Sequence, residues 1–167
     1  MAQVNLPLGK ALELFYQIGN VPDPTNPLDA VNLETLNNAI AATILGIPFV
    51  FGDGVNAITA TGLVISIPIP FACTITAVTV LGVASGSTVI DIQKCTYAQF
   101  DGGSTHPVSG DSICAAAKPT ISSGTKYTDS TLTGWTTSVS AGDILALNIN
   151  SISGFLALTL ELTVVRS

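Results

Sequence analysis

Charged side chains are scarce in this sequence. Asp, Glu, Lys and Arg make up 10% of its 167 residues, against about 25% in an ordinary soluble domain. Only five are Lys or Arg, these are scattered, and the formal net charge is −6. Because phosphate contacts require clustered basic side chains, this composition argues against nucleic acid as a partner. A surface with so few charges depends on Ser, Thr, Asn and Gly for solubility, or is partly covered in an assembly.

The chain also lacks a long apolar run, although 47% of its residues are hydrophobic and its mean hydropathy is +0.58. A membrane-spanning helix needs about 18 or more apolar residues, and Pro48, Pro68 and Pro70 interrupt the most hydrophobic stretches. The N-terminus has no basic segment followed by an apolar block, as a secretory signal would have. We therefore expect no membrane contact and assembly in the cytosol.

Residue types that carry catalysis or hold metals are few and dispersed. The only histidine, His106, lies in a Gly- and Ser-rich loop, and a hydrolase triad would need a serine and an acid positioned around it. The spacings typical of zinc and calcium sites and of Gly-rich phosphate loops are absent. Asp91 and Glu161 fall in the middle of expected strands, where an exposed face or a sheet edge explains them, and Asp53 fits a turn. The sequence therefore predicts no enzyme activity, no cofactor and no metal.

The three cysteines, Cys73, Cys95 and Cys114, cannot all pair within one chain. Cys95 and Cys114 flank a polar loop, and a disulfide between them would stabilise the fold by ~3 kcal/mol. Free buried thiols are the simpler interpretation and the one that we prefer, while the bridge remains the alternative.

Alternation of apolar and polar residues is the strongest pattern present. Near the C-terminus, Leu156, Leu158, Leu160, Leu162 and Val164 fall on every second residue. An extended chain places all five on one face, whereas a helix would scatter them around its circumference. This segment is therefore predicted to be a half-buried strand.

Similar alternation predicts further strands beyond residue 47. The expected segments are 63–69 as an edge strand because of its prolines, 71–81 and 88–94 joined by a hairpin turn at 85–87, then 115–121, 131–135 and 144–149. Residues 96–110 are too polar to enter a core and are expected to form a loop. About eight short strands with few helices indicate an all-β, two-sheet antiparallel sandwich of jelly-roll type. We assign it residues 47–167.

Residues 1–46 have a different character. Proline and glycine punctuate residues 1–30, which favours an extended arm. Residues 32–45 are predicted to form one short helix that begins at Asn32 and ends before Gly46. An apolar stripe on this helix, together with two aromatic residues of the arm, forms the candidate anchoring or oligomer interface: Leu33, Leu36, Ile40, Ile44, Phe15 and Tyr16. The stripe either packs on the chain's own sheets or contacts sister subunits or a partner.

Aromatic residues suggest one further surface. Trp135 is expected to lie in the core or in packing between subunits, whereas Tyr97 and Phe100 border the polar loop. With His106, these two residues form a candidate surface recognition loop, because exposed rings can stack on sugars.

Several segments in colinear order resemble a β-sandwich module found in bacteriophage structural and tail-associated proteins. They are residues 52–54, 57–62, 67–75, 89–94, 97–100, 118–123, 129–138, 141–145 and 159–166. The resemblance covers about residues 50–167 and implies a virion component, similar to a trimeric capping or binding domain, with no catalytic residues. Only a short arm and helix precede the module, so this chain is not expected to build a fibre shaft.

Our leading hypothesis is a capsid decoration (cement) or head-protrusion protein that forms a homotrimer. It would be assembled in the cytoplasm of the bacterial host and would dock through residues 1–46 on the major capsid protein or on other virion proteins. The alternative is a tail-tip or fibre-tip module that binds host surface polysaccharide. A polysaccharide depolymerase is a third, weaker hypothesis.

Overall fold

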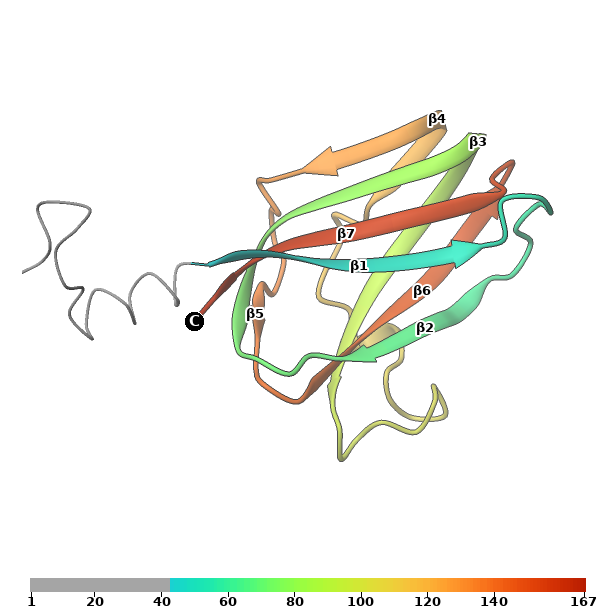
Figure 1. Cartoon of the computed structure of the whole chain (residues 1–167). Helices are drawn as coiled ribbons and strands as arrows, with labels where there is room; N and C mark the ends of the chain where they lie inside the picture. Colours follow the sequence, from blue (N-terminus) through green and yellow to red (C-terminus); the bar gives the residue numbers. More distant parts are fainter. Residues whose placement is uncertain (1–42) are drawn as a thin grey trace, which may run out of the picture. The chain divides into compact units, whose positions relative to one another are not determined.

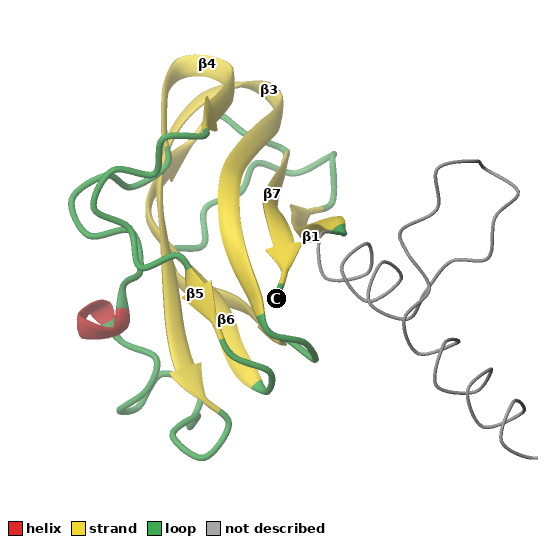
Figure 2. Cartoon of the chain, turned by 90° about the vertical axis from the view of Figure 1, so that its left-hand side faces the viewer, coloured by secondary structure: helices red, strands yellow, loops and turns green. Residues whose placement is uncertain are grey.

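The computed structural model describes residues 43–167, and the compact unit that they form begins at Thr43. Its strands are β1 (Ile44–Gly52), β2 (Gly62–Pro68), β3 (Cys73–Thr96), β4 (Thr120–Asp129), β5 (Ser138–Val139), β6 (Asp143–Ser153) and β7 (Ala157–Arg166). Within these residues the only helical element is the 3-10 turn η1 (Ser109–Asp111) (Figure 2). The predicted all-β class is confirmed.

Part of the sequence-based prediction lies outside the described residues. This applies to the N-terminal arm, to most of the 32–45 helix, and to Phe15, Tyr16, Leu33, Leu36 and Ile40. Ile44 is described, and its assignment to a helix is wrong. It is the first residue of β1, and its side chain is 69% exposed. The reason is the pairing of β1 with β7, which runs without interruption from Ile44 opposite Val165 to Gly52 opposite Ala157.

All seven strands belong to one antiparallel sheet that curls on itself (Figure 1). The strand order is β1-β7-β3-β6-β2, and β4 and β5 pair along the other side of β3. The two-sheet sandwich is thus not confirmed as such, because hydrogen bonds connect every strand to the same sheet. The edge position predicted for residues 63–69 from Pro68 and Pro70 is confirmed, since β2 is the last strand in this order.

The curl arises in β3, which is a single strand of 24 residues. Its first limb pairs with β7, up to Val83 opposite Ala157, and its second limb pairs with β6 from Ser87 opposite Ser153 onward. Figure 1 shows the two limbs diverging from the bend between them. The hairpin turn predicted at residues 85–87 is therefore wrong: the chain bends there and continues, so that the sheet folds over itself.

Phe155 fills the bend. Its side chain is fully buried in the connection between β6 and β7. A Cβ at Gly82 or at Gly86 would lie closer to the Phe155 ring than van der Waals contact allows, and one at Gly86 would also collide with the Ser153 carbonyl oxygen. The two glycines therefore make room for the ring. The sequence Ser85-Gly86-Ser87 is typical of a turn, but here the glycine lets the strand pack closely against Phe155.

The core lies between the two limbs of the curled sheet. The alternation predicted for the C-terminal strand is confirmed, since Leu158, Leu160, Leu162 and Val164 are all buried, and Leu156 lies half-buried in the turn before β7. Other inward-facing side chains come from β1, β3 and β6: Ile47, Phe49, Ile75, Val78, Val80, Ile90, Ile92, Leu145, Leu147 and Ile149. Both limbs thus contribute to one core.

The segment between residues 115 and 135 was assigned incorrectly. The strand in this region is β4, which occupies the Ser-, Gly- and Thr-rich stretch expected to be a connection, while 131–135 forms a turn. Of the ten residues of β4 only Ile121 is buried. Because β4 inserts only one side chain fully into the core, its sequence shows no alternation of apolar and polar residues that would reveal a strand.

We expect Gly86→Ala to lower the free energy of unfolding by about 1–3 kcal/mol, because the added methyl group overpacks the bend of β3. Urea unfolding followed by circular dichroism measures this change. Gly110→Ala is the matched control, since a Cβ at Gly110 meets no atom within 4 Å. Equal unfolding midpoints for the two variants would show that the bend does not depend on this close approach.

Candidate functional site

The predicted recognition loop lies in the 97–119 segment, which connects β3 to β4. Tyr97 is 78% exposed and Phe100 is 38% exposed. Both belong to the turn that follows β3, where the Phe100 amide donates to the Thr96 carbonyl (3.1 Å). The Gln99 side-chain oxygen accepts from the Thr96 amide (3.0 Å) and hydroxyl (2.9 Å). The turn is therefore held by its own hydrogen bonds and presents two aromatic rings.

Asp101 closes the next turn of the segment. Its carboxylate accepts hydrogen bonds from the Thr105 hydroxyl, the Thr105 amide (2.8 Å) and the His106 amide (2.9 Å). These bonds, that of the Thr105 hydroxyl most of all, hold the pKa of Asp101 well below its usual range. The Asp101 amide in turn donates to the His106 carbonyl (3.1 Å). Hydrogen bonds in both directions thus join the two ends of the loop tip, Asp101 and His106.

His106 is paired with an acid of η1. Its Nδ1 lies 2.9 Å from Asp111 Oδ2, and the Val108 amide donates to the same oxygen (2.8 Å). Desolvation opposes ionisation of Asp111, but these hydrogen bonds outweigh it, and the pKa of Asp111 is lowered. The contact was not predicted, although the two residues lie only five positions apart in the sequence. Its effect is to fasten the loop tip to η1.

Asp91 anchors the second half of the segment, and the exposed position predicted for it is wrong. Its side chain is fully buried on β3. Lys118 Nζ lies 2.9 Å from Oδ2, the Ser112 hydroxyl donates to Oδ1, and Gln93 Nε2 lies 3.4 Å from Oδ2. A buried carboxylate is tolerated only when it is paired and hydrogen-bonded in this way. The partners at 112 and 118 come from the 112–119 segment, far from Asp91 in sequence.

Residues 112–119 lie beside the second limb of β3 and are hydrogen-bonded to it. The Ile113 amide donates to the Ile92 carbonyl (2.9 Å), and the Ile90 amide donates to the Pro119 carbonyl (3.0 Å). Trp135 Nε1 donates to the Ala117 carbonyl (2.9 Å), and this indole is only 9% exposed. Trp135 therefore packs in the core of its own chain, one of the two positions expected for it. Backbone and side-chain contacts together fix this segment.

The three cysteines are free and buried. The preferred interpretation is thus confirmed, and the Cys95–Cys114 bridge is not formed. Burial raises the pKa of Cys73 and of Cys95, and it raises that of Cys114 to about 12. Because the thiolate is the reactive form, such thiols are poor nucleophiles at neutral pH. They act as small apolar groups of the core.

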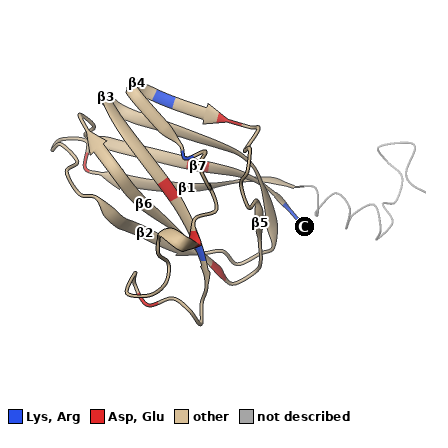
Figure 3. Ribbon diagram, turned by 180° about the vertical axis from the view of Figure 1, so that it is seen from behind, with Lys and Arg blue, Asp and Glu red and all other residues tan. Residues whose placement is uncertain are grey.

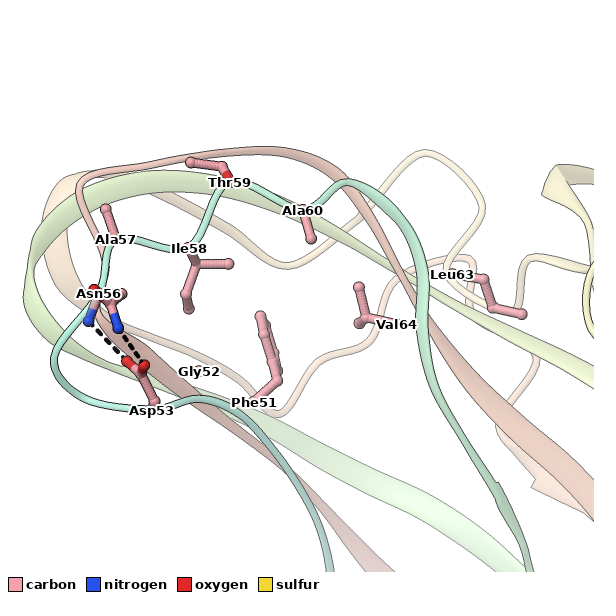
Figure 4. A pocket seen from close by; sticks show the side chains of 10 residues that line it. All are labelled: Phe51, Gly52, Asp53, Asn56, Ala57, Ile58, Thr59, Ala60, Leu63 and Val64. Atoms are coloured by element: carbon pink, nitrogen blue, oxygen red, sulfur yellow. Dashed lines mark hydrogen bonds between the residues drawn. The ribbon is translucent and has the colours of Figure 1, made fainter.

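One hollow of about 540 Å³ lies beside the connection from β1 to β2. Figure 4 shows its apolar lining, which includes Phe51, Ile58 and Val64, with Asp53 and Asn56 at one end. The Asp53 carboxylate accepts from the Val55 amide (2.9 Å), the Asn56 amide (2.7 Å) and Asn56 Nδ2 (2.6 Å). Asp53 is therefore the turn residue that was predicted. The hollow itself was missed, because its lining comes from two strands and a loop.

The part of the chain from residue 43 onward contains no group of three or more His, Cys, Asp or Glu residues placed to hold a metal ion. No helix among these residues is long and apolar enough to cross a membrane. No protein-family model matches the chain, and no curated protein or solved structure matches it either. The resemblance to bacteriophage modules therefore stays a prediction from the sequence.

We expect Asp91→Ala to lower the free energy of unfolding by about 3–5 kcal/mol, because it leaves the partly buried Lys118 ammonium without its partner. Chemical denaturation of the full chain measures this loss. Adding Lys118→Met to Asp91→Ala is expected to recover part of it, since no unpaired charge then remains. Ser130→Ala, at an exposed position that follows β4, is the control and should change stability by about 0.5 kcal/mol or less. An Asp91→Ala variant as stable as this control would contradict the anchoring role.

The hydrogen bonds to Asp53 lower its pKa from the ordinary value of 3.8 to about 2. The folded chain therefore binds this proton more weakly than the unfolded chain, so the contribution of Asp53 to stability is complete above pH 4. It is lost as the pH falls through the folded pKa. An NMR titration of the Asp53 carboxyl group should give this low midpoint, and Asn56→Ala should raise it. An unshifted midpoint in both proteins would show that the turn does not hold the carboxylate.

Proposed function

We propose that this chain is a non-enzymatic structural protein of a bacteriophage virion, a capsid decoration (cement) or head-protrusion protein. In this proposal residues 1–46 dock on the major capsid protein or other virion proteins, and the β-structured unit is displayed on the particle surface. The protein is assembled in the cytoplasm of the bacterial host. The sequence resemblance of residues 50–167 supports the class of protein.

The observation that carries the proposal is the way in which the 97–119 segment is held. Its charged side chains act in internal contacts: Asp101 closes a turn, Asp111 pairs with His106, and Lys118 pairs with Asp91. Among the described residues, no buried side-chain nitrogen or oxygen is without a hydrogen-bond partner. Groups engaged in this way stabilise a surface and are not poised to react. A displayed shell component needs such a loop surface, which keeps its shape without a ligand.

The exposed rings of Tyr97 and Phe100 favour a second candidate function. A receptor-binding module at a tail or fibre tip would use such rings to stack on host surface polysaccharide, since aromatic faces bind apolar ligand surfaces. The hydrogen-bonded turn at residues 96–100 would hold both rings in place before binding, which lowers the entropy cost of binding. This alternative keeps the virion location and exchanges the capsid for a glycan as the partner.

The two functions are distinguished by what the purified chain binds. We expect it to co-sediment with capsids that lack it, and we expect deletion of residues 1–30 to abolish co-sedimentation while leaving the unit that begins at Thr43 folded. Host cells are the second target. Binding to cells but not to capsids, with loss of cell binding in Tyr97→Ala, would replace the decoration proposal by the receptor-binding alternative. Capsid binding unaffected by the deletion would reject docking through the arm.

A further inference from the structure

The first limb of the curled sheet has an outer face that no other part of residues 43–167 covers. It is formed by β1, β7, the first limb of β3 and the end of β4, and we call it the limb face. Its outward side chains alternate with the buried ones: Ile44, Pro48, Val50, Thr74, Thr79, Leu81, Val83, Lys126, Thr128, Thr159, Glu161, Thr163 and Val165. Ile44, Val50, Leu81 and Val83 are each more than half exposed.

The second limb differs sharply on its outer side. There Asp91, Gln93 and Ala146 are buried, and the Ser112 and Lys118 side chains of the segment beside β3 contact the Asp91 carboxylate. The same sheet thus has one outer face that its own chain contacts and one that the rest of the described chain leaves uncovered. Exposed aliphatic side chains on a contiguous sheet face indicate an interaction surface more than a solvated one.

Strand register arranges the limb face in rows. In one row Pro48 lies opposite Glu161, which lies opposite Thr79, with Thr128 next to it. In the next row the order is Val50, Thr159, Leu81 and Lys126. Each row crosses four strands without a gap. The surface is therefore regular enough to pack against another sheet face, as stacked sheets do at about 10 Å.

The two charged residues of the limb face, Glu161 and Lys126, lie on opposite sides of β3. Glu161 leans over β1, since its side-chain carboxyl carbon would lie 3.1 Å from a Cβ at Gly46. Lys126 lies on β4. Between them runs the β3 stripe of Thr79, Leu81 and Val83, which carries no charge. Figure 3 shows how few charged residues lie along these strands.

Two threonine hydroxyls of the limb face are partners of each other. Thr79 Oγ1 lies 3.2 Å from Thr128 Oγ1. Covering this pair therefore removes less hydrogen bonding to water than covering two separate hydroxyls would.

We propose that the limb face binds a second copy of this chain. Rotation about an axis parallel to β3 places the β7 side of one copy against the β4 side of the next, so that Glu161 of one copy lies diagonally across from Lys126 of the other, one row away. The β3 stripes then pack against each other. Because the contact is reciprocal, one surface serves both copies. This inference concerns the chain alone and holds whether or not the protein is part of a virion.

The size of the limb face fits such a contact. Three strands of nine residues, together with the four residues of β4 that pair with the first limb, give about 490 Å² per copy at about 4.8 Å spacing and about 3.3 Å rise. Two copies would bury about 1,000 Å², which is the threshold of specific interfaces. We therefore expect a reversible association that depends on concentration and on the charges of Glu161 and Lys126.

Charge exchange tests the proposal in the full chain. In analytical ultracentrifugation the unmodified chain should associate at micromolar concentration, whereas Glu161→Lys alone and Lys126→Glu alone should each raise Kd about tenfold or more, since like charges then face each other. An equimolar mixture of these two variants, and the double variant, should restore association. Thermal unfolding checks that each variant is folded.

Two controls complete the experiment. Leu81→Glu places a charge on the stripe and should give monomers, whereas Ser109→Glu, at an exposed position of η1 off the limb face, should leave association unchanged. A full chain that stays monomeric at all micromolar concentrations would overturn the proposal. So would charge variants that associate as well as the unmodified chain, because self-association would then use another surface.

Discussion

The packing of Phe155 into the bend of β3 is the contact on which the rest of the structure depends. Glycine at positions 82 and 86 lets the ring approach the strand, and the ring lies between the two limbs of the sheet. If β3 continued straight, its two limbs would form one flat ribbon with one apolar face open to water. Because the strand bends, the inward side chains of both limbs cover each other. A single steric arrangement therefore converts a sheet into a closed core.

Once the sheet is folded over, its two outer faces differ. On one of them, Asp91 is buried beneath contacts from the 112–119 segment. The Lys118 ammonium and the Ser112 hydroxyl of this segment bind the Asp91 carboxylate. A buried carboxylate is costly when unpaired, so this pairing specifies where the segment lies. The other outer face bears threonine and aliphatic side chains, and no other part of residues 43–167 covers it. Display of the loops and association through this face are therefore compatible in one chain.

The success of period-two analysis has a clear limit. It located β7 and β6 because their inward faces are made of consecutive alternate leucine, isoleucine and valine residues. It failed for β4, where only Ile121 is buried, and for residues 85–87, whose composition is the same in a turn and in a tight bend. Ile44 was misplaced because an apolar residue at helical spacing also fits the first position of a strand.

For the candidate site, sequence proximity was the deciding factor. Tyr97 and Phe100 could be recognised as loop residues, and His106 lies close to Asp111 in the chain. The pairing of Asp91 with Lys118 could not be foreseen, because it joins a strand to a segment that follows a long loop. The rows of the limb face likewise require the register of four strands that are far apart in sequence.

The sequence by itself determined the all-β class, the inward faces of the leucine-rich strands and the edge position of β2, because these follow from local alternation and from proline. Only the tertiary structure decided that the strands form one curled sheet, that Asp91 is buried and that the rest of residues 43–167 leaves one outer face of this sheet uncovered. Those outcomes depend on contacts between residues far apart in the sequence, and such contacts produce no regular pattern of apolar and polar residues.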